Sequence, residues 1–142
     1  MKEHPSFIQR PDPSLCELEP MEPIIVYRIR GGELKDCLKG SAKSVVYFWS
    51  PNCSAPVCIP PNFAQEFSSR HGVDLFIVAN YYDYSEMAVD FDLERPIFGV
   101  DTEYYRTNFT DRYLRRFKAD LFDENSRDEN DVGRFICLNL TV

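Results

Sequence analysis

Two short apolar runs flank a helical pattern in the middle of the chain. Residues 44–49 (SVVYFW) are almost unbroken in hydrophobicity, which is typical of a strand buried on both faces of a sheet. Residues 73–79 (VDLFIVA) have the same character. Between the two runs, residues 62–71 place Phe63 and Phe67 on one helical face and end before a glycine. This order predicts a strand–helix–strand unit with two parallel strands.

Shorter patterns extend this unit in both directions. Residues 24–30 (IIVYRIR) are β-branched and aromatic and precede two glycines, which predicts a first strand. Residues 33–39 have helical spacing before another glycine and predict a short helix or an irregular turn. The remaining expected elements are a short helix over 85–92, a short strand or bridge over 96–100 and a terminal strand over 134–140.

An aromatic stripe predicts the longest helix, over residues 101–122, with a break near Asn108. Large apolar side chains recur every fourth residue, with Leu114 beside them: Tyr105, Phe109, Tyr113, Phe117 and Leu121. A helix that covers a sheet needs such a stripe for core packing. We therefore interpret the stripe as core and not as a cofactor cradle.

A proline-rich segment precedes the first expected strand. Residues 1–23 contain five prolines, which block helix interiors and central strands, so we expect an extended leader. Residues 24–142 suffice for one domain, and their alternating strands and helices predict the α/β class. The polar residues 123–131 predict a solvated loop, because the ligand positions of a calcium-binding loop are missing.

Charge and hydropathy exclude some partners. The chain carries 23 acidic and 16 basic residues, a formal net charge of −7, which repels the phosphate backbone of nucleic acids. No apolar run approaches the roughly 20 residues of a membrane span, and residues 1–10 lack the apolar core of a secretion signal. As written, the chain is expected to be soluble and cytoplasmic. It would instead be periplasmic or in the cell envelope if an export signal had been removed.

The five cysteines include one close pair, Cys53 and Cys58. We expect Cys37 and Cys137 to be buried as free hydrophobic residues, and Cys16 to be exposed in the leader. No second cysteine pair has zinc-ligand spacing, and the two histidines are isolated in the sequence. The sequence therefore predicts no metal site and no cofactor.

The close pair lies in residues 49–61 (WSPNCSAPVCIPP), between a buried strand and a helix. Parallel sheets place their chemistry in such loops, and a helix N-terminus favours the reactive thiolate. A continuous helix would hold the two Cα atoms more than about 7 Å apart, too far for a disulfide. The prolines at Pro56, Pro60 and Pro61 disfavour that helix, so a loop can bring the cysteines together. Two unlinked thiols remain the alternative.

This segment resembles the thioredoxin-like superfamily, and within it the bacterial TlpA-like branch of thiol-disulfide oxidoreductases. The matching positions are a Phe-Trp strand end, two cysteines, a helix proline and an Asn after the next strand: Phe48, Trp49, Cys53, Cys58, Pro61 and Asn80. The resemblance implies a thioredoxin-like three-layer sandwich, with a mixed sheet and helices on both faces, which we expect to be shortened at the C-terminus. It also implies that Cys53 attacks a disulfide and Cys58 resolves the mixed disulfide. Trp49, Pro51 and Pro56 would form a wall beside the substrate, although core packing explains Trp49 about as well.

Three departures from the family pattern leave a second function open. Four residues lie between the cysteines instead of two, and residues 131–134 lack the proline that would supply a cis peptide bond. The family's closing hairpin strand and helix are also missing, so we expect an uncovered sheet face or edge that invites self-association. The first hypothesis is an oxidoreductase acting on protein thiols or disulfides. The alternative is a redox-inactive thioredoxin-like module that binds a partner protein.

Overall fold

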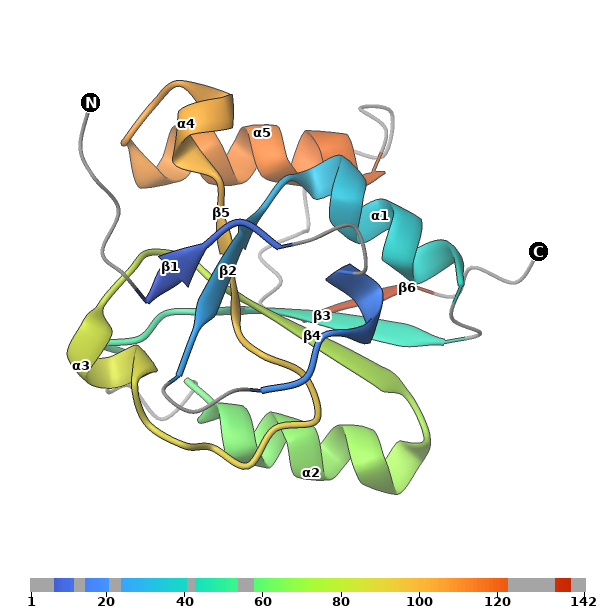
Figure 1. The fold of residues 1–142 in the computed structure, drawn as a ribbon. Helices are drawn as coiled ribbons and strands as arrows, with labels where there is room; N and C mark the ends of the chain where they lie inside the picture. Colours follow the sequence, from blue (N-terminus) through green and yellow to red (C-terminus); the bar gives the residue numbers. More distant parts are fainter. Residues whose placement is uncertain are drawn as a thin grey trace.

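The computed structural model describes residues 7–11, 15–20, 24–40, 43–53 and 58–122, and the backbone of residues 135–138. Strands and helices alternate along the chain (Figure 1), which confirms the predicted α/β class. The strands are β1 (Ile8–Gln9), β2 (Val26–Ile29), β3 (Ser44–Trp49), β4 (Asp74–Ala79), β5 (Phe98–Val100) and β6 (Phe135–Leu138). The helices are the 3-10 turn η1 (Leu15–Glu17), α1 (Gly31–Lys39), α2 (Pro61–His71), α3 (Tyr84–Met87), α4 (Thr102–Tyr105) and α5 (Thr110–Phe122).

One sheet runs through the domain in the order β1-β2-β5-β4-β3-β6. β3 and β4 pair in parallel over their whole length, from Ser44 opposite Asp74 to Trp49 opposite Ala79, so the predicted strand–helix–strand unit is confirmed. The neighbouring strands from β1 to β5 all run parallel, and the expected mixed sheet is wrong for them. Of the strands described, β6 is the antiparallel one, paired with β3 at the edge.

Helices cover both faces of this sheet (Figure 1). α1 and α5 lie on one face and α2 lies on the other. Along β3 the side chains alternate between the two cores, because successive side chains of a strand point to opposite faces. Val46 and Phe48 pack toward α1 and α5, whereas Tyr47 and Trp49 join the core beneath α2. The uncovered face expected from the C-terminus is therefore not found in the described part of the sheet.

The two phenylalanines of α2 lie on its exposed side. Phe63 and Phe67, which share one helical face as predicted, are 56% and 53% exposed. The buried face consists mainly of smaller side chains: Pro61, Ala64, Gln65 and Ser68. Small side chains let the helix approach the bulky aromatic residues of β3 closely, and both sets of residues have helical spacing. Periodicity therefore could not decide which face points inward.

The aromatic stripe spans two helices, as the expected break near Asn108 implies. α4 ends at Arg106, whose φ of 57° is left-handed and terminates the helix, and α5 starts at Thr110. Four of the five stripe residues are buried: Tyr105, Tyr113, Phe117 and Leu121. Phe109 lies between the helices and is 67% exposed, so its assignment to the core was wrong. The helix expected over 85–92 is limited to α3.

The proline-rich leader contributes to the domain. β1 extends the sheet beside β2, and Leu15 of η1 is buried in the core on the α1 side. Cys16 is exposed, as expected, but it forms a disulfide with Cys37 of α1, 5.3 Å apart between Cα atoms. Cys37 is buried, and the expectation that it is a free hydrophobic residue was wrong.

Several sequence expectations concern residues outside the described ranges. These are the solvated loop over 123–131, the burial expected of Cys137, and the place of Pro56 in the substrate wall. They stay predictions.

Candidate functional site

A disulfide joins Cys53 and Cys58 at the carboxyl end of β3, with 6.0 Å between their Cα atoms. Both residues are partly exposed. The approach to Cys53 is a tight turn, in which its N–H donates to the carbonyl oxygen of Ser50 at 3.1 Å. Pro51 occupies the second position of this turn, where its fixed φ is favourable. Both cysteines therefore lie outside any helix, as the prolines predicted.

Cys58 is closer in sequence to the start of α2 than Cys53 is. The helix begins at Pro61 with Pro60 as its N-cap, so Cys58 precedes the N-cap by two residues and Cys53 by seven. The favourable effect of a helix dipole decays within about one turn. The disulfide holds both sulfurs at one place, so the expected stabilisation of thiolate by the helix stays a prediction for either cysteine.

The residue after Cys58 is held by a tyrosine of β3. The Tyr47 hydroxyl donates to the carbonyl oxygen of Ile59 at 2.6 Å and accepts from the N–H of the same residue at 3.2 Å. Tyr47 points toward α2 because of the strand alternation, and its side chain is buried. A buried tyrosine hydroxyl needs a polar partner, which here is the backbone beside the disulfide.

The residue before Cys53 is held by the loop that follows β4. The N–H of Asn52 donates to the Tyr81 hydroxyl at 2.9 Å, and the Asn52 side-chain amide donates to Asp83 Oδ2 at 2.7 Å. The hydrogen bond from Asn52 lowers the pKa of Asp83, and that from Ser85 acts in the same direction. Asp83 also caps α3 by accepting from the N–H of Glu86.

The loop that follows β4 is also bonded to the end of β3 through Asn80, the residue before Tyr81. The N–H of Asn80 donates to the carbonyl oxygen of Trp49 at 2.7 Å, and its side-chain amide donates to Ser50 Oγ at 2.8 Å. The Tyr113 hydroxyl of α5 donates to the carbonyl oxygen of Asn80. Asn80, one of the positions that resemble thioredoxin-like proteins, therefore joins the carboxyl ends of β3 and β4. The chain continues from the end of β3 to Cys53.

The predicted wall residues are buried where they are described. Trp49 is 5% exposed and meets the ring of Phe91 edge-on, with 5.6 Å between ring centroids. Pro51 is buried as well. This burial favours the core-packing interpretation of Trp49.

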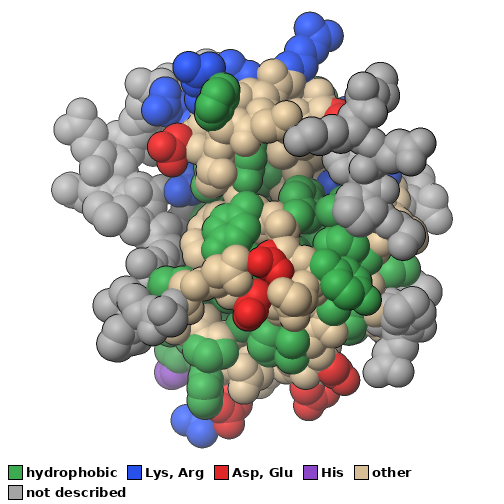
Figure 2. All heavy atoms as spheres, turned by 90° about the vertical axis from the view of Figure 1, so that its left-hand side faces the viewer, with side chains coloured by type: hydrophobic (Ala, Val, Ile, Leu, Met, Phe, Trp, Pro, Cys, Tyr) green, Lys and Arg blue, Asp and Glu red, His purple; other side chains and the backbone are tan. Residues whose placement is uncertain are grey.

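Charge is unevenly distributed along the sequence segment that contains the disulfide. Arg70 is the single Lys or Arg between residues 44 and 94, a segment that includes Asp83, Glu86 and Asp90. Figure 2 shows acidic side chains in the middle of one face of the domain, with hydrophobic side chains around them. Within the described residues, no three His, Cys, Asp or Glu side chains are grouped so as to hold a metal ion.

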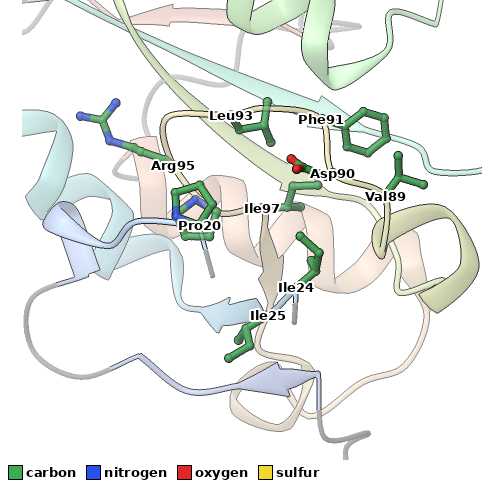
Figure 3. A pocket seen from close by; sticks show the side chains of 10 residues that line it. Pro20, Ile24, Ile25, Val89, Asp90, Phe91, Leu93, Arg95 and Ile97 are labelled. Atoms are coloured by element: carbon green, nitrogen blue, oxygen red, sulfur yellow. The ribbon is translucent and has the colours of Figure 1, made fainter. Parts of the chain in front are cut away.

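A cavity of about 30 Å³ lies beside the loop that leads from α3 to β5 (Figure 3). Its lining is mostly apolar: Pro20, Ile24, Ile25, Val89, Asp90, Phe91, Leu93, Arg95, Pro96 and Ile97. This volume has room for little more than a water molecule, so it supplies no site for a substrate. No described helix combines the length and apolar character that a membrane span requires.

Sequence reasoning identified the two cysteines but missed the groups that hold their loop. Tyr47 was interpreted only as part of a buried strand, and Asn52, Tyr81 and Asp83 were assigned no role. The clue for Tyr47 was its hydroxyl, because a tyrosine in a fully buried strand must find a polar partner. No protein-family model, curated protein or solved structure matches the chain.

Proposed function

We propose that the chain is a thiol-disulfide oxidoreductase that exchanges electrons with protein thiols or disulfides through Cys53 and Cys58. The observation that carries this proposal is the disulfide between these two partly exposed cysteines at the carboxyl end of β3. This end of a parallel sheet is where such folds place their reactive groups. The bond holds both sulfurs together at one partly exposed site.

The proposed reaction is a two-step exchange that starts from the reduced protein. The Cys53 thiolate attacks one sulfur of a substrate disulfide, forms a mixed disulfide and expels the other sulfur as a thiolate. The Cys58 thiol loses its proton and attacks Cys53, which releases the second substrate thiolate and forms the Cys53–Cys58 disulfide. Two electrons pass to the substrate, and a thiol reductant must restore the dithiol. With an excess of oxidised protein the same steps run backward and oxidise substrate thiols.

The roles of the two cysteines come from the resemblance to thioredoxin-like proteins. It is supported by the β3–loop–α2–β4 unit and by helices on both sheet faces. The proposal includes a complete thioredoxin-like sandwich, but the two-step exchange does not depend on it.

Thiol alkylation followed by mass spectrometry tests the proposal. Mild reductant should free two thiols that peptide mapping assigns to Cys53 and Cys58, and a glutathione disulfide mixture should close them again. The variant with Cys53→Ser and Cys58→Ser is the matched control, because any thiols that mild reductant still frees in it come from the Cys16–Cys37 disulfide. Thiol counts that stay constant across these conditions would reject the proposal.

A second candidate is a redox-inactive module that binds a partner protein. The observation that favours it is the exposure of Phe63 and Phe67 on α2, since exposed large apolar side chains often mark contact sites. It predicts that the double serine variant at Cys53 and Cys58 binds a partner as well as the wild type does. Loss of binding in that variant would contradict it.

A further inference from the structure

The residues next to the two cysteines of the Cys53–Cys58 disulfide are held by hydrogen bonds that do not involve sulfur. Ile59, next to Cys58, is held by the Tyr47 hydroxyl. Asn52, next to Cys53, is held by the Tyr81 hydroxyl and by Asp83. Breaking the disulfide removes none of these contacts.

We propose that Tyr47 and Tyr81 are positioning residues of the dithiol site, whose hydroxyls keep Cys53 and Cys58 within reach of each other after reduction. The inference rests on the proposed function, because positioning matters only if the disulfide opens and closes. Two groups held together react as if their concentration were very high, since the entropy of bringing them together has already been lost. The two tyrosines thereby favour the closed disulfide over the open dithiol.

Tyr47 contributes more than Tyr81. Its hydroxyl makes these two hydrogen bonds with the backbone of one residue, Ile59, and Tyr47 is 1% exposed in the core beneath α2. The anchor therefore comes from a buried side chain of the central sheet. Tyr81 acts at a more exposed position, where Asn52 also bonds to Asp83 and the next residue is held by the Ser50 turn.

The equilibrium with reduced and oxidised glutathione measures this positioning. Tyr47→Phe removes the hydroxyl and keeps the ring, so the equilibrium constant for closing the disulfide should fall, by at most about tenfold, because only the difference in hydrogen-bond free energy between the two redox states shifts it. A tenfold change corresponds to a reduction potential about 30 mV less negative. Tyr81→Phe should lower the constant in the same direction by a smaller factor.

Tyr82→Phe is the matched control. It removes a tyrosine hydroxyl that donates to the carbonyl oxygen of Val100 at 2.7 Å, in the same loop as Tyr81 but without a bond to Asn52 or Ile59. Its glutathione equilibrium should equal that of the wild type, even though its stability falls. A change as large as that of Tyr47→Phe would show that the equilibrium follows general destabilisation, and would overturn the inference.

Hydrogen exchange at the Ile59 amide gives an independent result. The wild type should protect this amide in both redox states, and reduced Tyr47→Phe should lose the protection. If Tyr47→Phe does not fold, Tyr81→Phe decides by the same equilibrium. When the wild type equilibrates with glutathione but these variants match it, the inference alone is refuted. When the wild type shows no equilibrium, the proposed function fails and the inference fails with it.

Discussion

Cys16 and Cys37 connect the segment ahead of β2 to α1 across 21 positions of sequence. The bond lies next to Leu15, which is 5% exposed in the core on the α1 side. Closer to the N-terminus, Arg10 forms two hydrogen bonds with the Glu33 carboxylate of α1, at 2.8 and 3.0 Å. A covalent bond and an ion pair therefore hold the leader on the domain.

Removal of the Cys16–Cys37 bond should destabilise the protein. The variant with Cys16→Ser and Cys37→Ala should lose about 3 kcal/mol of unfolding free energy, because the open chain regains the entropy that a loop of this length gives up. Urea unfolding measures the loss. The Cys53–Cys58 pair should still open and close in this variant, since its anchoring groups lie elsewhere. An unchanged free energy would show that the bond adds no constraint.

Two adjacent glycines at the start of α1 should respond in opposite ways to alanine. A Cβ at Gly31 would collide with the carbonyl oxygen of Phe117 in α5, so Gly31→Ala should cost about 2 kcal/mol or more. A Cβ at Gly32 meets nothing within 4 Å, so Gly32→Ala should stabilise the helix by about 0.5 kcal/mol. Thermal unfolding of the two variants makes the comparison. Equal shifts would contradict the close contact of α1 with α5.

The Arg10–Glu33 pair should make stability depend on acidic pH. Burial alone would raise the pKa of Glu33, but the hydrogen bond from Arg10 and the nearby arginine charges lower it below 4.5. A lowered folded pKa means that the stabilisation is complete above about pH 4.5 and is lost as the pH falls through the folded value. Glu33→Gln should therefore cost about 0.5 kcal/mol at neutral pH, since the pair is partly exposed, and nothing in strong acid. Denaturant unfolding across this range tests it, and a difference that does not shrink with acid would contradict it.

The exposed face of α2 should tolerate polar residues. The variant with Phe63→Ser and Phe67→Ser should change the unfolding free energy by less than about 1 kcal/mol, because both side chains are more than half exposed. Phe117→Ala is the contrasting control and should cost about 4 kcal/mol, since Phe117 is fully buried. If the α2 variant lost as much stability as the control, the orientation of the helix would be wrong.

Local pattern was sufficient to predict most elements of the described domain. β3 coincides with the predicted run 44–49, and α2 differs from its predicted span by one residue, ending before Gly72, whose φ is +61°. Such elements depend on residues close in sequence: apolar runs, prolines that prevent helix, and a glycine that accepts a left-handed backbone. For the same reason the prolines around Cys53 and Cys58 were enough to predict a loop that can form a disulfide.

Tertiary structure decided what depends on partners distant in sequence. Close packing of Ala64 and Ser68 on the sheet determines which face of α2 points inward. The spacing of Phe63 and Phe67 does not determine it, because both faces have helical spacing. The pairing of Cys16 with Cys37, and the hold of Tyr47 on Ile59, required the chain to bring separate segments together. Residue types and spacing specify which groups need a partner, but only the folded backbone determines which partner lies within a few ångströms.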